Sequence, residues 1–237
     1  MPTFRLPRTL AAGLSLALAT TAAFAAAPPQ PFTATYQVLR DGEAIGQATI
    51  RLKAVGNGQY EYSNDVKGTS GLAAMLGASS SEITRFRWTD GAPETLTYDY
   101  RLETAIKHKQ RHLQADWSAH QVNVTNNGKR YSYATATGMV DRNTLPLALG
   151  LALQDGKRNV TLPVGVKQRV ENQQFQVKGN ETVKVPAGSF QAERVERTDS
   201  DKPFDAWYAP KKYPVPVKLA QSDGGNLILQ LTGYRQP

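Results

Sequence analysis

The chain has 237 residues, no cysteine and a formal net charge of +8 at pH 7. Without cysteine there is no disulfide framework, no thiol nucleophile and no site for a lipid-attached cysteine. The positive balance favours acidic partners such as lipid head groups, lipopolysaccharide or anionic glycans. Net charge, however, affects the rate of encounter with a partner and the solubility of the protein, and it does not determine the fold.

The first 27 residues have the three parts of a secretory signal peptide. A basic start is followed by an apolar stretch, Leu10 to Ala19, and then by small residues, so that cleavage is expected after Ala25 or Ala27. No later apolar run approaches the roughly 18 residues that a membrane helix needs. The sequence therefore predicts an exported periplasmic protein that is soluble after signal-peptide removal.

The mature chain alternates between apolar and polar residues in many segments. Residues 48–54 place Ala48, Ile50, Leu52 and Ala54 on one face, and residues 96–102 do the same with Leu96, Tyr98, Tyr100 and Leu102. Such alternation is typical of half-buried antiparallel strands. We therefore predict an all-β, mainly antiparallel fold, either a strongly curved sheet or a half-open barrel.

Dipeptides that tolerate positive φ separate many of these segments. They are Asp41-Gly42, Asn57-Gly58, Asn127-Gly128 and Gly224-Gly225. Tight hairpin turns require such residues, and the spacing indicates about a dozen strands. We expect residues 28–237 to form a single β domain, because no linker or internal repeat interrupts them.

Two segments lack the alternation and are rich in Ala and Leu. Residues 68–81 and 141–156 are predicted to form the two short helices of the fold. Asn143 or Thr144 is a candidate N-cap for the second helix, and Gly156 lies just beyond its expected end.

A Pro-Ala-Gly-Ser step divides two strand-like runs within residues 183–198. Pro presets φ and Gly accepts a positive value, so Pro186 and Gly188 fit the corner of a hairpin. A phosphate-binding loop would need more glycines and a following helix, which the sequence does not offer.

Several short motifs of the mature chain together resemble the DUF3108 family of exported bacterial proteins of unknown function. They are the Pro-Ala-Gly turn (Pro186, Ala187, Gly188), the Trp-x-Ala-Pro step (Trp207, Ala209, Pro210), the Pro-Val pair (Pro216, Val217) and the closing Leu-Thr-x-Tyr (Leu231, Thr232, Tyr234). The segment "DRNTLPLAL" and the N-terminal strands fit the same pattern. The resemblance implies a periplasmic β-protein and provides no catalytic residues.

A weaker, pattern-level similarity connects the same order of motifs to periplasmic lipoprotein carriers. Their half-open barrel shelters acyl chains behind a helical lid. Fold similarity does not settle function, so this similarity contributes only an expectation.

Residues capable of catalysis or metal binding are sparse. The serines at 79–81 lack a nucleophile elbow. His108 and His112 would share a face only on a helix, whereas their segment is predicted to be a strand, and neighbouring lysines would repel a cation. Asp199, Asp201 and Asp205 fit an ordinary turn better than a calcium loop or an acid–base pair. We predict no catalytic residue, metal or cofactor.

A basic strand face is the first candidate site. Lys107, Lys109 and Arg111 alternate and would present three cations about 7 Å apart, which suits phosphate or sulfate groups. A solvated outer face is the alternative interpretation.

The apolar residues of the two predicted helices are the second candidate site. We expect them to cover a cavity of the sheet, or alternatively to fill an ordinary core; they are Leu72, Met75, Leu76, Leu147, Leu149 and Leu151. The leading hypothesis is a non-enzymatic periplasmic protein that binds or carries an apolar or amphiphilic envelope molecule, with peripheral membrane contact and no nucleic-acid partner. The alternatives are an envelope interaction protein that uses the basic strand face or a sheet edge, and a glycan-acting enzyme.

Overall fold

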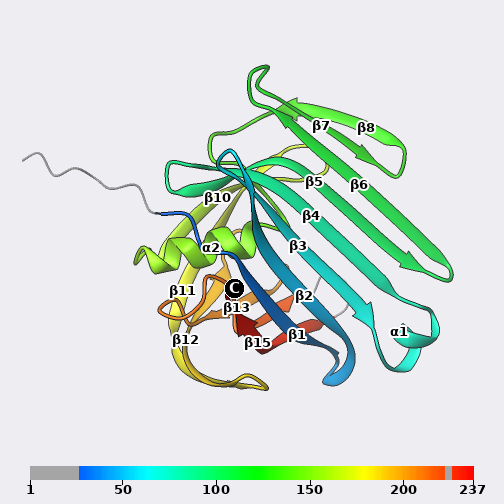
Figure 1. Cartoon of the computed structure of the whole chain (residues 1–237), viewed down its shortest axis with the longest axis vertical. Helices are drawn as coiled ribbons and strands as arrows, with labels where there is room; N and C mark the ends of the chain where they lie inside the picture. The colour runs from blue at the N-terminus through cyan, green and yellow to red at the C-terminus, as the bar shows by residue number, and fades with distance from the viewer. Residues whose placement is uncertain (1–26, 222–225) are drawn as a thin grey trace, which may run out of the picture.

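The computed structural model describes residues 27–221 and 226–237, so the signal-peptide prediction lies almost wholly outside the described residues. Strands make up most of the described chain (Figure 1). The first eight are β1 (Phe32–Arg40), β2 (Glu43–Gly56), β3 (Gln59–Gly68), β4 (Ser79–Thr89), β5 (Ala92–Thr104), β6 (Lys107–Asp116), β7 (Gln121–Asn126) and β8 (Lys129–Ala134). The remainder are β9 (Val140–Asp141), β10 (Asn159–Gly165), β11 (Val170–Val185), β12 (Gly188–Arg197), β13 (Phe204–Tyr208), β14 (Lys218–Gln221) and β15 (Leu227–Arg235).

The fifteen strands of the described residues all belong to one sheet, in the order β8-β7-β6-β5-β4-β3-β2-β1-β15-β14-β13-β12-β11-β10-β9. Almost every neighbour in the sheet is also a neighbour in sequence, and these pairs are antiparallel. Two pairings differ: β1 joins the distant β15, and β9 runs parallel to β10. The pairing of β1 with β15 unites the two halves of the chain.

Tight turns produce this antiparallel order. Asp41-Gly42, Asn57-Gly58 and Asn127-Gly128 all have positive φ at both residues, as the predicted hairpins require. Gly224-Gly225 lies outside the described residues. The Pro186–Ala187 corner joins β11 to β12, with Val185 opposite Gly188.

The sheet curls into a half-open barrel with edge strands β8 and β9. Contacts other than a strand ladder connect strands and loops near the two edges. The backbone N–H of Thr95 on β5 donates to Met139 O at 2.9 Å, just before β9. The Tyr133 hydroxyl on β8 donates to Val166 O at 2.6 Å. The predicted all-β, half-open fold is confirmed.

Helix α2 (Leu145–Gln154) fills the concave interior of the sheet (Figure 1). Leu147 and Leu149 are fully buried and belong to two different apolar clusters of the core, so the helix joins them. Gly150 permits its close approach to the connection between β13 and β14, since a Cβ there would lie 2.0 Å from Pro214 O. The helix therefore packs against both of these clusters.

Helix α1 (Gly71–Met75) is shorter than the segment predicted for it. The prediction of a helix through residue 81 is wrong for its last part, because Ser79, Ser80 and Ser81 pair with β3 as the start of β4. Serine has little helix propensity, and the neighbouring strand provides backbone partners that the helix would lose. No helix within the described ranges is long and apolar enough to span a bilayer.

Candidate functional site

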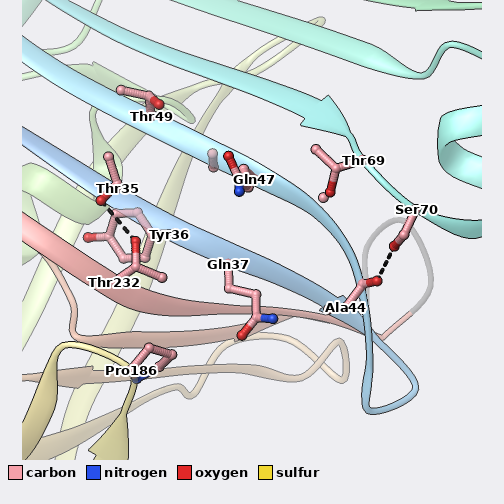
Figure 2. Close-up of a pocket in the computed structure, with 12 residues that line it drawn as sticks. Thr35, Tyr36, Gln37, Ala44, Gln47, Thr49, Thr69, Ser70, Pro186 and Thr232 are labelled. Atoms are coloured by element: carbon pink, nitrogen blue, oxygen red, sulfur yellow. Dashed lines mark hydrogen bonds between the residues drawn. The ribbon is translucent and has the colours of Figure 1, made fainter.

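A groove of about 750 Å³ runs along the first two strands (Figure 2). It ends at the β3–α1 connection on one side and at the β11–β12 corner on the other. Its twelve lining residues are Thr35, Tyr36, Gln37, Ala44, Gly46, Gln47, Ala48, Thr49, Thr69, Ser70, Pro186 and Thr232. This volume lies within the range typical of sites for small organic ligands.

The pairing of β1 with β2 places the polar side chains of the groove together. Thr35 lies opposite Thr49, and Gln37 lies opposite Gln47. Because strand side chains alternate, these four share the face opposite to that of the buried Tyr36. The row therefore presents two hydroxyls and two amides and has no formal charge.

Hydrogen bonds order both ends of the groove (Figure 2). At one end the Thr232 hydroxyl donates to Thr35 Oγ1 at 2.9 Å. At the other, the Ser70 hydroxyl donates to Ala44 O. The walls are thus held in place by contacts within the protein.

A buried acidic residue lies inside the barrel. The carboxylate of Asp141 accepts five hydrogen bonds, from the hydroxyls of Thr84 (3.0 Å), Thr95 (2.8 Å) and Thr144 (3.0 Å), and from the backbone N–H groups of Asn143 (2.8 Å) and Thr144 (3.2 Å). Burial raises its pKa, and these donors partly offset that rise. These five donors use the hydrogen-bonding capacity of the two carboxylate oxygens. The arrangement therefore suits a structural role, in which Asp141 ties β4, β5 and the start of α2 together.

A bulge in β5 makes one of these contacts possible. Arg85 pairs with Thr97 but Phe86 pairs with Thr95, so Leu96 is an extra residue. The expectation that Leu96 continues the face of Tyr98 is therefore wrong, because the extra residue shifts the alternation. As a result Thr95 points into the interior and reaches Asp141.

A second acid lies beside the first. Glu82 on β4 accepts a 2.6 Å hydrogen bond from the Tyr98 hydroxyl. Burial raises the pKa of Glu82, while the Arg142 guanidinium and the Tyr98 hydroxyl act in the opposite direction. Burial also raises the pKa of the Tyr98 hydroxyl.

The predicted basic face is found on β6, as an alternating row. Lys107 and Lys109 are exposed, whereas Arg111 is half-buried and donates to Asn126 Oδ1 at 3.0 Å.

The predicted helical cover is divided between two places. Leu72 and Met75 on α1 are exposed and Leu76 is half-buried, whereas Leu147 and Leu149 on α2 are buried and Leu151 is partly buried in the core. The six residues do not form one continuous surface: α1 packs on β2 and β3, and α2 packs on β5, β9 and β10.

The histidines and aspartates singled out in the sequence are separated. His108 and His112 lie on the strand β6, and His112 Nδ1 contacts Asp99 Oδ1 at 2.8 Å. Asp199 is paired with Arg197, and Asp205 with Arg194, through hydrogen bonds of 2.8–3.0 Å. Across the described ranges, no group of three or more potential metal ligands converges.

The sequence matches a family described as "Protein of unknown function (DUF3108)" over residues 31–232. The chain belongs to the DUF3108 family. A comparison with curated proteins gave no match.

Among solved structures, the DUF3108 chain is similar to a β-barrel-like protein of the domain of unknown function DUF1849 from Brucella abortus. The TM-score is 0.53 at 10% identity, with 88% of this chain and 98% of that chain covered. This likeness supports the fold alone.

Two other structures are more distant. One is a protein from Bacteroides fragilis with a YmcC-like fold, described as exported (TM-score 0.35, 12% identity, 91% of this chain and 100% of that chain). The other is a chain of the MucA/MucB complex of Pseudomonas aeruginosa (TM-score 0.29, 12% identity, 87% and 51%). These TM-scores are too low to support an argument.

The four short motifs singled out in the sequence converge in space on Leu231. The Val217 N–H donates to Trp207 O at 2.8 Å, the Leu231 N–H donates to Val217 O at 2.9 Å, and the Ala187 N–H donates to Leu231 O at 2.9 Å. One residue of each motif thus takes part in a single chain of backbone hydrogen bonds. Pro186 and Thr232, which flank these contacts, line the groove.

The groove residues themselves were not predicted from the sequence. The polar positions of "TATYQV" and "IGQATI" carry a signal, since they alternate with buried residues. That signal is shared by any solvent-exposed strand face. What distinguishes this face from other exposed strand faces is that Pro186 and Ser70, from distant parts of the chain, lie at the two ends of the row.

Proposed function

We propose that this chain is a non-enzymatic periplasmic protein that binds the uncharged part of an amphiphilic envelope molecule in the groove along β1 and β2. The observation that carries the proposal is the composition of the groove: none of its twelve lining residues is charged. Hydroxyl and amide side chains can exchange hydrogen bonds with a sugar or glycerol moiety. Ala44 and Pro186 provide apolar contact beside them.

The position of α2 determines where such a ligand would bind. Leu147 and Leu149 occupy the interior that a barrel carrier would use for its cargo. The outer groove is therefore the better candidate, and the α2 leucines act as core residues in this proposal. Export to the periplasm is part of the proposal and is supported by the signal-peptide pattern of the first 27 residues.

The test is native mass spectrometry of the protein purified gently from the periplasm of its host, followed by organic extraction. We expect added mass on the wild type and its loss in Thr49→Trp, because the indole would fill the groove. Thr161→Trp introduces the same side chain at an exposed position of β10 and should retain the bound mass. An unliganded mass for the wild type, unchanged by added host lipids and glycolipids, would contradict the proposal.

A second candidate function is protein interaction at a sheet edge. β8 pairs only with β7 among the described strands, so one side of its backbone is open to a strand from another protein. Ser132→Pro would remove one N–H group from this edge. Loss of a specific periplasmic cross-linked species in this variant, with the Thr49→Trp variant unaffected, would favour this function over groove binding.

A further inference from the structure

One end of the sheet exposes three large apolar side chains. Leu72 and Met75 on α1 are 66% and 82% exposed, and Ile106 in the β5–β6 turn is 81% exposed. The Ala105 N–H donates to Leu76 O at 2.9 Å, so the turn and the helix are neighbours. Figure 1 shows α1 and the turn between β5 and β6 at the same end of the molecule. We call these three residues the apolar tip.

The apolar tip is held on a fixed support. The Thr69 N–H donates to Ile45 O at 2.9 Å, and the Ala78 N–H donates to Ala73 O at 2.9 Å. The inner side of α1 packs tightly on β3, since a Cβ at Gly68 would lie 2.9 Å from Ala73 Cβ. The exposure of Leu72 and Met75 therefore belongs to the packed structure of α1 and does not result from fraying.

Exposed lysines flank the apolar tip. Lys107 follows Ile106 directly, Lys109 lies two residues further along β6, and Lys67 lies at the end of β3 next to α1. Within the described part of the chain, none of the three forms an ion pair. The combination is a small apolar protrusion with unneutralised ammonium groups beside it.

We propose that the apolar tip docks onto an anionic lipid surface. Leu72, Met75 and Ile106 would enter the boundary between head groups and acyl chains, while the lysines contact lipid phosphates. Charge complementarity favours a lipid surface over a neutral protein partner, because apolar insertion and phosphate contact are both satisfied at a membrane interface. This inference goes beyond the proposed groove function and uses different residues.

Vesicle co-sedimentation tests the apolar contribution. Protein from the periplasm is mixed with vesicles of phosphatidylglycerol and phosphatidylethanolamine, or of phosphatidylcholine alone. We expect binding to the anionic vesicles, and about tenfold weaker binding or less for the combined variant Leu72→Ser, Met75→Ser and Ile106→Ser. Val55→Ser is the matched control, since Val55 is 47% exposed at the opposite end of β2. Thr49→Trp should bind vesicles like the wild type. Failure of the groove proposal can then be distinguished from failure of the membrane proposal.

Charge and salt test the electrostatic contribution. The pair Lys107→Gln and Lys109→Gln should bind several-fold more weakly to anionic vesicles, whereas Lys53→Gln with Lys157→Gln changes the net charge equally at exposed positions elsewhere and should have little effect. Binding should fall as sodium chloride is raised to about 0.5 M, because the Debye length shortens. Equal losses in the two lysine pairs would overturn the localisation of binding to the tip.

A single-site label provides an independent readout, because the chain contains no cysteine. Met75→Cys carrying an environment-sensitive fluorophore should shift to shorter wavelength on addition of anionic vesicles, and Val55→Cys should not. No shift at either position, or the same shift at both, would overturn the proposal. A shift that depends on protein concentration without vesicles would instead show self-association through the tip and would also overturn it.

Discussion

Thr95 donates its hydroxyl hydrogen to the buried carboxylate of Asp141 across 2.8 Å. The bond joins a bulged position of β5 to the short edge strand β9, so the interior of the curled sheet is connected to the edge that would otherwise be free. Thr84 on β4 makes the equivalent contact with the other carboxylate oxygen at 3.0 Å. The start of α2 is thereby attached to both strands.

Replacing this acid should destabilise the fold. In Asp141→Asn one carboxylate oxygen becomes an amide nitrogen, which cannot accept a hydrogen bond. It replaces either the acceptor of the Thr84 hydroxyl and the Asn143 and Thr144 N–H groups, or the acceptor of the Thr95 and Thr144 hydroxyls. We expect a loss of about 2–4 kcal/mol in the free energy of unfolding, measured by urea denaturation. Asp155→Asn, an exposed position at the end of α2, should change it by less than about 0.5 kcal/mol. Equal effects of the two substitutions would contradict the assigned role.

Glu82 should make stability depend on pH. Burial raises its pKa, so the folded chain keeps the proton to a higher pH than the unfolded chain does. Between the ordinary and the raised pKa the native state therefore binds more protons, and stability falls as pH rises through this window. Above the raised pKa the loss is complete.

Thermal unfolding of the wild type and Glu82→Gln between pH 3 and 8 measures this contribution. The wild type should lose stability relative to the variant as pH increases. Tyr98→Phe removes the hydroxyl that favours the charged carboxylate, so it should extend the decline to higher pH. A difference between wild type and Glu82→Gln that stays constant over this range would show that the Glu82 pKa is not raised.

The two groups of helical leucines should respond differently to truncation. Leu147→Ala empties space in a fully buried position and should cost about 2–5 kcal/mol of unfolding free energy. Leu72→Ala removes a side chain that is 66% exposed and should cost less than about 0.5 kcal/mol. Denaturant titrations of both variants provide the comparison. A small loss of unfolding free energy in Leu147→Ala would contradict the core role of α2 and would favour a movable cover.

Gly150 is expected to tolerate no side chain. A Cβ would lie 2.0 Å from Pro214 O and 3.0 Å from Tyr208 Cε1, so α2 would have to move away from β13 and the connection that follows it. Gly150→Ala should therefore lower the melting temperature strongly, even though alanine is the better helix former. Gly179→Ala, where nothing lies within 4 Å, is the matched control and should have a small effect. A stabilised Gly150→Ala variant would contradict the close packing.

The sequence alone predicted turns and strand faces where a residue's own conformational preference or the alternation of a strand determines them. Asp41-Gly42 and Asn127-Gly128 determine their turns because tight hairpins require positive φ. Alternation in residues 48–54 identified the buried face of β2 at Ala48, Ile50 and Leu52, but not at Ala54, which is exposed. The Pro186–Gly188 corner was predicted for the same reason. Where a local pattern and a neighbouring strand competed, as at Ser79–Ser81, the strand partner prevailed.

Only the tertiary structure decided which distant segments meet. The apolar composition of α2 fits either a lid or a core helix, and its burial followed from the curl of the sheet around Leu147 and Leu149. The groove required β1 and β2 to lie beside the β11–β12 corner, and the apolar tip required Ile106 to lie next to α1. Sequence periodicity predicts which face of an element is buried. The partner against which that face is buried depends on long-range pairing, such as that of β1 with β15.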